Sequence, residues 1–285
     1  EICRDFVGID PARELIPVRP TQHYSMGGVR VNKEGEAYSM AGLFAVGEAS
    51  CWDMHGFNRL GGNSLAETIV SGRLVGRHIA KTIGAGGVEV DTQVANEAVK
   101  HAEDRAARLL AAEGPGPGAY EIRDAMAEVM IGRVGIFRTG EELTLAVGEL
   151  TELLAKCDKI VLRSKVPGMN PELTFALRIK NMVRLSLITA MGALARTESR
   201  GAHYRSDYPL RDDAQWLNRT LARWPSSSNA PEIGYEPVGV LDVPPGHRGY
   251  GSDERIEMEQ TIEDYNQGVE QAQSEQGKLP TEGQQ

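Results

Sequence analysis

The chain has 285 residues, of which 41% are hydrophobic and 25% are charged, and its formal net charge at pH 7 is −9. This composition predicts a globular chain of one or two domains with a hydrophobic core. The negative charge argues against a nucleic-acid-binding surface, and no apolar run reaches the length that crosses a membrane.

The three cysteines are far apart in the chain, at Cys3, Cys51 and Cys157. Their spacing fits neither a disulfide framework nor a metal-binding cluster, so a reducing compartment is favoured. Nothing at the start of the chain resembles a signal peptide. Because the sequence begins with Glu1 instead of methionine, we expect a processed or partial sequence.

The first part of the chain is interpreted as β-rich. Residues 1–19 predict a loop or a short helix. After His23, a glycine pair turns the chain into a short strand at residues 29–31, where two valines alternate with an arginine. Residues 32–36 predict a turn. This region, together with the helix that follows it, is typical of the end of a dinucleotide-binding domain, although the usual Gly-x-Gly-x-x-Gly opening is absent from the sequence.

A short apolar run from Leu43 to Val46 lies between glycines, which is typical of a buried strand. Glu48 comes just past the end of this expected strand. An acidic side chain in that position can accept hydrogen bonds from ribose hydroxyls. Glu48 is therefore a candidate nucleotide contact, and the plain alternative is that it caps a neighbouring loop.

A helix is predicted to begin at Asn63 or Ser64. Ser64 and Glu67 match the Ser-x-x-Glu pattern of a capping box. The residues expected on the buried face follow at helical spacing: Leu65, Ile69, Gly72, Gly76 and Ile79. The glycines would allow close backbone packing. Free amides at the helix start would suit an anion or a developing negative charge.

From Val94 onwards the sequence predicts amphipathic helices. Three apolar stripes indicate the buried faces of the first three: Val99, Ala102, Ala106, Leu109 and Leu110; Ile122, Met126, Val129, Met130 and Val134; Leu143, Val147, Leu150, Leu154 and Cys157. A glycine–proline run at residues 114–118 separates the first two. Asn170 and Pro171 predict the start of a long helix that continues to about Arg196. Short connections between long helices predict an antiparallel bundle.

The C-terminal part is less regular. Residues 225–230 predict a polar loop, and residues 235–243 alternate weakly, as one or two strands would. From Ser252 the chain is rich in Glu and Gln, which predicts a frayed helix or disorder.

Several polar side chains are candidates for function. Arg59 lies between a His-Gly turn and the predicted helix start, and arginine is the side chain best shaped to grip a carboxylate; an ordinary surface arginine is the alternative. His55 is as readily a structural residue as a substrate contact, and Cys51 and Trp52 are more simply explained as packing. The methionine pair Met126 and Met130 is interpreted as core.

A second charged group contains Arg200, His203, Arg205 and Asp207. Two arginines would repel a cation, so a metal site is not expected. The favoured interpretation is a buried or half-buried polar network that fixes the end of the bundle. The alternative is a contact to the nucleotide-binding domain or to a partner subunit.

These motifs together resemble the flavoprotein subunit of fumarate reductase and succinate dehydrogenase, the complex II family. The residues that carry the resemblance are His-Tyr-Ser-Met-Gly-Gly from His23, Gly-Leu-Phe-Ala-Val-Gly-Glu from Gly42, His55-Gly56, and Asn-Arg-Leu-Gly-x-Asn-Ser-Leu from Asn58. The resemblance continues through the segment that begins at Arg200 and reaches about residue 250. Met26 and residues 200–213 favour this respiratory branch.

The resemblance implies an FAD-dependent oxidoreductase that interconverts fumarate and succinate. In this family a hydride passes between flavin N5 and one alkene carbon, and a proton goes to the other carbon. By the same resemblance, the substrate-binding residues are His23, Arg59 and Gly62, and the cofactor-binding residues are Glu48, Asn63, Ser64 and Leu65. The pyrophosphate loop, the flavin-attaching histidine, the capping domain and the proton-delivering arginine of the family lie upstream of His23. No catalytic residue is therefore expected within this chain.

The resemblance also implies partners and a place in the cell. An iron–sulfur subunit would exchange electrons with the flavoprotein, a membrane anchor subunit would hold it indirectly, and no nucleic acid is involved. The complex would lie at the cytoplasmic face of the inner membrane and serve anaerobic respiration or the tricarboxylic acid cycle.

The expected fold class is α+β. Residues 1–87 are interpreted as the C-terminal part of a Rossmann-like FAD-binding domain, residues 88–224 as an antiparallel helical bundle, and residues 225–285 as an irregular segment with a disordered tail. Two alternatives stay open: an enzyme resembling L-aspartate oxidase, which has a similar His-Tyr and Asn-Ser-Leu framework, and a non-catalytic helical module that docks an iron–sulfur subunit.

Overall fold

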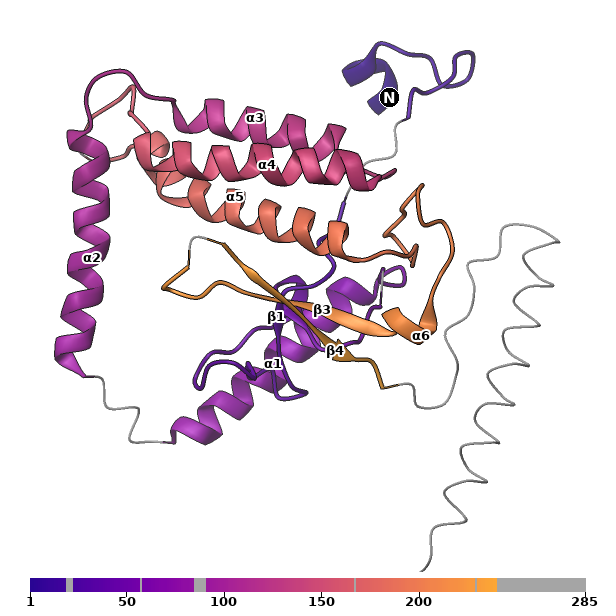
Figure 1. Cartoon of the computed structure of the whole chain (residues 1–285), viewed down its shortest axis with the longest axis horizontal. Helices are drawn as coiled ribbons and strands as arrows, with labels where there is room; N and C mark the ends of the chain where they lie inside the picture. Colours follow the sequence, from indigo (N-terminus) through magenta and orange to yellow (C-terminus); the bar gives the residue numbers. More distant parts are fainter. Residues whose placement is uncertain (19–22, 57, 85–90, 167, 229, 240–285) are drawn as a thin grey trace, which may run out of the picture. The chain divides into compact units, whose positions relative to one another are not determined.

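The computed structural model describes residues 1–18, 23–56, 58–84, 91–166, 168–228 and 230–239 (Figure 1). The chain divides into two compact units, Glu1–Val90 and Asp91–Gln285. Helices and short strands are both present, which confirms the mixed fold class. Among the described residues, no helix is long and apolar enough to cross a membrane.

The first unit contains short elements and one long helix. In chain order these are the π-helix Cys3–Val7, β1 (Val29–Arg30), the 3-10 helix Gly47–Ala49, β2 (Ser50–Cys51) and α1 (Asn63–Ile83). The two strands pair in parallel, with Val29 opposite Ser50 and Arg30 opposite Cys51. The predicted strand at residues 29–31 and the turn that follows it are confirmed, although the strand is one residue shorter.

The predicted strand from Leu43 to Val46 is wrong. Phe44 forms only an isolated bridge with Glu36, flanked by hydrogen bonds from Ala37 N to Leu43 O (2.8 Å) and from Ala45 N to Gly35 O (2.9 Å). A strand becomes regular when it pairs along its length, and this run pairs with a single turn on one side among the described residues. Leu43 is 37% exposed.

The start of α1 is predicted correctly, but its capping box is wrong. The N-cap is Gly62, in the left-handed region at φ 80°, and no side chain caps the helix. Glu67 does not reach back to the helix start, because the residue is buried (3% exposed) and its side chain accepts a hydrogen bond from Trp52.

The predicted buried face of α1 is also wrong, since Leu65 and Ile69 are 68% and 64% exposed. The helix packs through other positions, against the 3-10 helix Gly47–Ala49. Glu67 and Val75 are its buried residues. A Cβ on Gly35 would lie only 2.5 Å from Val75 Cγ2, so a glycine there lets the turn approach the helix.

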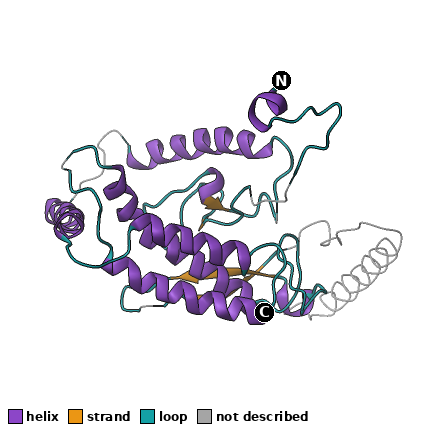
Figure 2. Ribbon diagram, turned by 90° about the horizontal axis from the view of Figure 1, so that it is seen from above, coloured by secondary structure: helices purple, strands orange, loops and turns teal. Residues whose placement is uncertain are grey.

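The second unit is mostly helical. Its elements are α2 (Thr92–Ala111), α3 (Ala119–Gly132), α4 (Gly140–Lys156), the 3-10 helix Cys157–Lys159, α5 (Pro171–Ala195), α6 (Asp213–Trp216), β3 (Asn218–Arg223) and β4 (Glu232–Pro237). In Figure 1, α3, α4 and α5 lie side by side, and each packs against the other two. Figure 2, with helices in purple, shows how far helix predominates among the described residues.

A continuous hydrophobic core runs through α3, α4 and α5. The second and third predicted stripes are confirmed as core: Ile122, Leu143, Leu150 and Val134 are at most 1% exposed, while Val147 and Leu154 pack at the edge. The first stripe is not core. The helix α2 has no buried residue, Val99 is 57% exposed, and only Leu109 and Leu110 reach the core.

The ends of α5 agree with the sequence. Asn170 is the N-cap, and its side-chain oxygen accepts a hydrogen bond from Leu173 N (3.0 Å), with Pro171 as the first helical residue. The helix ends at Ala195 with Arg196 as its C-cap. This cap geometry uses residues adjacent in sequence, which is why it could be predicted.

Near the C-terminus, β3 and β4 form an antiparallel pair in which Asn218 lies opposite Pro237 and Arg223 opposite Glu232. The strand β4 begins three residues before the predicted one, and β3 was not predicted. The polar loop at 225–230 is present in its described residues. Residues 85–87 of the expected linker, residues 240–243 of the expected strand and the tail from Ser252 lie outside the described residues.

Candidate functional site

The start of α1 is the focus of the candidate site. Asn63 N donates to Leu60 O (3.1 Å) and Ala66 N donates to Gly62 O (3.2 Å), so the first turn is tightly formed. The N-cap Gly62 offers no side-chain acceptor, and the amides of Ser64 and Leu65 therefore have no side-chain cap within the described chain. The positive end of the helix dipole is open to an external acceptor.

Arg59 lies just before this helix start and is held against an aromatic ring. Its guanidinium carbon lies 3.7 Å from the centroid of Tyr24, and its backbone N–H donates to Asn58 Oδ1 (2.9 Å). A cation over a ring face gains about 0.5–2 kcal/mol, depending on desolvation. A guanidinium carries five N–H donors in its plane, an arrangement that suits a planar acceptor such as a carboxylate.

Glu48 is tied to the same segment from the other side. Ser25 N donates to Glu48 Oε1 at 2.8 Å. This hydrogen bond is of the kind expected if Glu48 caps a neighbouring loop, the alternative to a nucleotide contact. The two backbone segments approach so closely here that a Cβ on Gly28, at φ 120°, would lie 2.4 Å from Ala49 O. Only glycine tolerates both this backbone conformation and this approach.

The structure thus gathers the sequence-predicted residues within one unit. Contacts join Tyr24 to Arg59 and Ser25 to Glu48, so the two residues that follow His23 are engaged, while His23 itself is exposed. Gly62 is the N-cap of α1, and Asn63, Ser64 and Leu65 form its first turn.

A buried polar group beside the site was not predicted. Trp52 Nε1 donates to Glu67 Oε1 (3.3 Å), and His55 Nε2 lies 3.9 Å from Glu67 Oε2. The Ser-x-x-Glu pattern had predicted a capping role for Glu67, and His55 had two possible roles, a structural residue or a substrate contact. The sequence position of Glu67 could have indicated its burial, because Glu67 and the buried Val75 are two helical turns apart, on one face of α1.

The second unit holds a denser polar network at the ends of α4 and α5. Arg205, 2% exposed, donates through Nη1 to the carbonyls of Ala193 (3.1 Å), Leu194 (3.0 Å) and Arg196 (3.2 Å), at the C-terminal end of α5. It also binds Asp207 with two hydrogen bonds, and Asp207 Oδ2 accepts from Gly140 N (2.9 Å) at the start of α4.

This arrangement places a cation at a helix C-terminus and an anion at a helix N-terminus, where each is favoured by the helix dipole. The hydrogen bonds from Arg205 lower the pKa of the Asp207 carboxyl below its ordinary value. The pair therefore links the ends of two core helices.

Glu198 and His203 complete the network. Glu198 is fully buried and accepts hydrogen bonds from Arg196 Nη1 (2.6 Å), Arg200 Nε (2.8 Å) and Asp212 N (2.8 Å). Burial, and then the charge of Arg138, lower the pKa of His203 to about 4. The expected polar network at the end of the bundle is confirmed for Arg200, His203, Arg205 and Asp207. Among the described residues no cluster of His, Cys, Asp and Glu could hold a metal ion.

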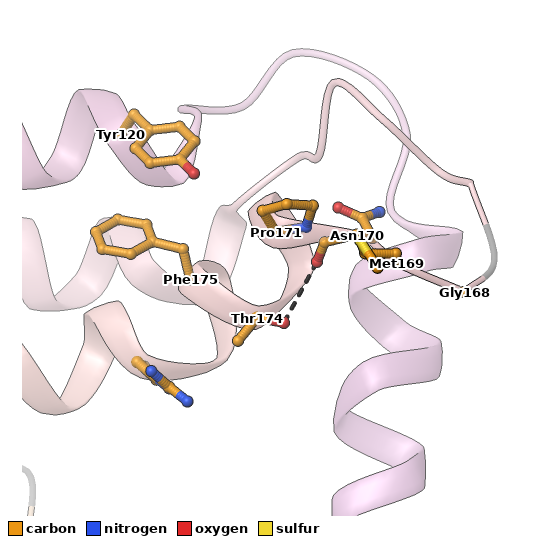
Figure 3. A pocket seen from close by; sticks show the side chains of 8 residues that line it. Tyr120, Gly168, Met169, Asn170, Pro171, Thr174 and Phe175 are labelled. Atoms are coloured by element: carbon orange, nitrogen blue, oxygen red, sulfur yellow. Dashed lines mark hydrogen bonds between the residues drawn. The ribbon is translucent and has the colours of Figure 1, made fainter.

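A shallow cavity of about 430 Å³ lies at the start of α5 (Figure 3). Tyr120 and Phe175 stack at its wall with ring centroids 4.8 Å apart, and Thr174 Oγ1 donates to Asn170 O (3.3 Å). Met169 at its rim is 95% exposed. None of the candidate site residues lines this cavity.

Comparison with known families gives two matches. Residues 123–250 match the family described as fumarate reductase flavoprotein C-term, and residues 1–65 match the family described as FAD binding domain. The two matched segments fall in different compact units.

Similar proteins and structures agree with these matches. The chain is 50% identical over 239 residues to a fumarate reductase flavoprotein subunit of Helicobacter pylori, covering 83% of this chain and 33% of that protein. It is 33% identical over 251 residues to the succinate dehydrogenase flavoprotein subunit of Bacillus subtilis, covering 88% and 43%. A structure of E. coli quinol fumarate reductase superimposes with a TM-score of 0.79 at 34% identity, over 87% of this chain and 42% of that one. The chain thus spans less than half the length of these relatives.

Proposed function

Because the chain belongs to the family of fumarate reductase and succinate dehydrogenase flavoprotein subunits and matches their C-terminal part, we propose that it completes the flavin and dicarboxylate site of such a subunit. The enzyme would interconvert fumarate and succinate. The observation that carries this proposal is the position of Arg59, stacked on Tyr24 and just before the uncapped start of α1. The relatives support this reading over the L-aspartate oxidase and docking-module alternatives.

The residues at the start of α1 fit a flavin. Amides of Ser64 and Leu65 without a side-chain cap, at the positive end of a helix dipole, would stabilise negative charge on a pyrimidine edge. Asn63 begins the same turn. Glu48 is exposed and anchored through one oxygen to Ser25, so its carboxylate is placed to accept a ribose hydroxyl. FAD, when bound, would supply the two-electron redox chemistry.

The substrate would be held by cations and a backbone turn. Arg59 presents the edge of its guanidinium, which can donate two parallel hydrogen bonds to one carboxylate. His23 is exposed beside Tyr24 and would bind the other carboxylate. Gly62, as the left-handed N-cap, would let the substrate approach the backbone closely. The group that delivers the proton is expected upstream of His23.

The wider assembly is part of the same proposal. An iron–sulfur subunit would exchange electrons with the flavin, and a membrane anchor subunit would hold the flavoprotein at the cytoplasmic face of the inner membrane. Residues 1–87 would complete a Rossmann-like FAD-binding domain, and residues 88–224 would form the antiparallel helical bundle. The similarity to structures of quinol–fumarate reductase and of the Mycobacterium smegmatis Sdh1 complex supports this part of the proposal.

The substitution Arg59→Lys tests the proposal in the complete flavoprotein that contains this chain. Lysine keeps the charge but cannot reproduce the two parallel hydrogen bonds. Disrupting a buried charged pair costs about 2–5 kcal/mol, and each 1.4 kcal/mol is about a factor of ten. We expect kcat/KM for fumarate to fall roughly a hundredfold while the flavin stays bound.

The matched control is Arg77→Lys, which makes the same change at an exposed arginine on α1. Steady-state fumarate reduction and flavin content should be measured on the same preparations. Normal turnover in Arg59→Lys would remove Arg59 from the site and would contradict the proposal.

A further inference from the structure

The carboxylate of Glu67 is buried beside the candidate site with part of its hydrogen-bonding capacity unused. Its side chain is 1% exposed, and the His55 side chain is 12% exposed. Trp52 satisfies one carboxylate oxygen. The other oxygen and His55 Nε2 have no hydrogen-bond partner within the described chain and face each other at 3.9 Å.

A buried carboxylate is costly to keep where an apolar residue would pack as well. Burying a charge without full pairing costs several kcal/mol. On α1 the other buried side chain is Val75, which packs against the Gly35 turn. Glu67 makes a different kind of contact, because both of its partners come from the loop that follows β2. Its role is therefore in holding this loop.

The loop from Trp52 to Gly62 connects β2 to the start of α1 and carries Arg59 near its end. Its described part contains two left-handed residues, Asp53 (φ 73°) and Gly56 (φ 59°), so the chain reverses sharply within it. Trp52 is joined to α1 by its hydrogen bond to Glu67, His55 lies beside the same carboxylate, and Arg59 then lies over the ring of Tyr24. The beginning of the loop is thus attached to α1 through Glu67, and Arg59 lies near the end of the loop.

We infer that Glu67 is a positioning residue: it fixes the loop through Trp52 and His55 and so sets where Arg59 stands at the helix start. This inference rests on the proposed role of Arg59. Displacement of a substrate-binding group by about 1 Å can cost up to a hundredfold in rate, so a loosened loop has a measurable effect.

A double-mutant cycle in the complete flavoprotein tests the inference. Glu67→Ala should lower kcat/KM for fumarate about tenfold, by misplacing Arg59. In an Arg59→Lys background the same change should cost less than about threefold, because residues that act through one another are not additive. Glu67→Gln should recover most of the loss, since its amide can accept from Trp52 and donate to a neutral His55.

Two further variants separate positioning from folding. Val75→Ala removes a buried side chain of the same helix without touching the loop; it should lower the melting temperature and leave kcat/KM of the flavin-loaded enzyme unchanged. Trp52→Phe removes the N–H donor together with the smaller ring of the indole, and should cost about threefold. If Glu67→Ala does not fold, Trp52→Phe takes its place in the cycle.

The outcomes are distinguishable. A normal kcat/KM in Arg59→Lys overturns both the proposed function and this inference. A large loss in Arg59→Lys together with an undiminished effect of Glu67→Ala, or of Trp52→Phe, in that background overturns the inference alone. A loss that appears in the wild-type background and vanishes in Arg59→Lys supports both.

Discussion

The two compact units bury their helices very differently. In the second unit, α3, α4 and α5 share a continuous core from Ala119 to Ala193. In the first, the buried hydrophobic side chains among the described residues are Val31, Ala37 and Val75. Yet the first unit carries the candidate site. The candidate site and the extensive hydrophobic core therefore belong to different units.

The small number of buried side chains in the first unit also explains why the predicted buried face of α1 is exposed. Leu65 and Ile69 are each more than half exposed, although their i, i+4 spacing is that of a buried stripe. An apolar face of this kind is stable when another surface covers it. We propose that the remainder of the FAD-binding domain covers it in the complete flavoprotein.

The largest expected effect comes from separating the units. A peptide of residues 91–239 should show strong helical circular dichroism and a cooperative thermal transition, because its core is internal. A peptide of residues 1–84 should show neither, because three buried hydrophobic side chains cannot offset the cost of ordering the chain. The full chain is the reference. A cooperative transition in residues 1–84 would remove the contrast between the units.

Within the second unit, the contrast between core and surface can be sharpened on one helix. Leu150 is fully buried on α4, and Leu145 on the same helix is 45% exposed. Leu150→Ala should lower the free energy of unfolding by about 2–5 kcal/mol, and Leu145→Ala by less than about 0.5 kcal/mol. Urea unfolding of residues 91–239 measures both. Equal losses would mean that the core described here does not hold the unit together.

The smallest expected effect is the pH dependence of stability that comes from His203. Its pKa in the folded state is about 4, below the ordinary 6.5, because of burial and the charge of Arg138. The unfolded chain therefore binds the proton more readily between these values. Stability is fully present above pH 6.5 and is lost as pH falls towards 4, by roughly 1–3 kcal/mol.

Melting temperatures of the helical unit at pH 7, 5.5 and 4.5 test this dependence. His203→Asn should flatten the decline, and His101→Asn, which changes an exposed histidine on α2, should leave it unchanged. The depressed pKa of Asp207 adds a separate loss, which begins only below its ordinary value of 3.8. A decline that persists unaltered in His203→Asn would show that another group controls it.

Local chemistry accounts for what the sequence predicted well. The start of α5 follows from Asn170 and Pro171, which act on amides within the same turn. The core stripes of α3 and α4 follow from helical periodicity, because the packing partners lie on neighbouring helices. The position of Arg59 before a helix start was likewise predicted, since the first helical residue can be identified from its neighbours.

Contacts between residues distant in sequence account for what was missed. Glu67 matched a capping box, but its carboxylate accepts a hydrogen bond from Trp52, fifteen residues earlier. The strand β3 contains polar residues without clear alternation, and its pairing with β4 stabilises it across a loop. The Leu43–Val46 run had the composition of a strand, but it pairs with only one turn in the described chain.

The central claim is that this chain completes a fumarate–succinate site, and one measurement tests it most directly. The complete flavoprotein should be mixed anaerobically with succinate or with L-aspartate while the visible absorbance of its flavin is followed. Succinate should bleach the flavin, Arg59→Lys should slow this bleaching, and L-aspartate should have no effect. Bleaching by L-aspartate with no response to succinate would contradict a fumarate–succinate site.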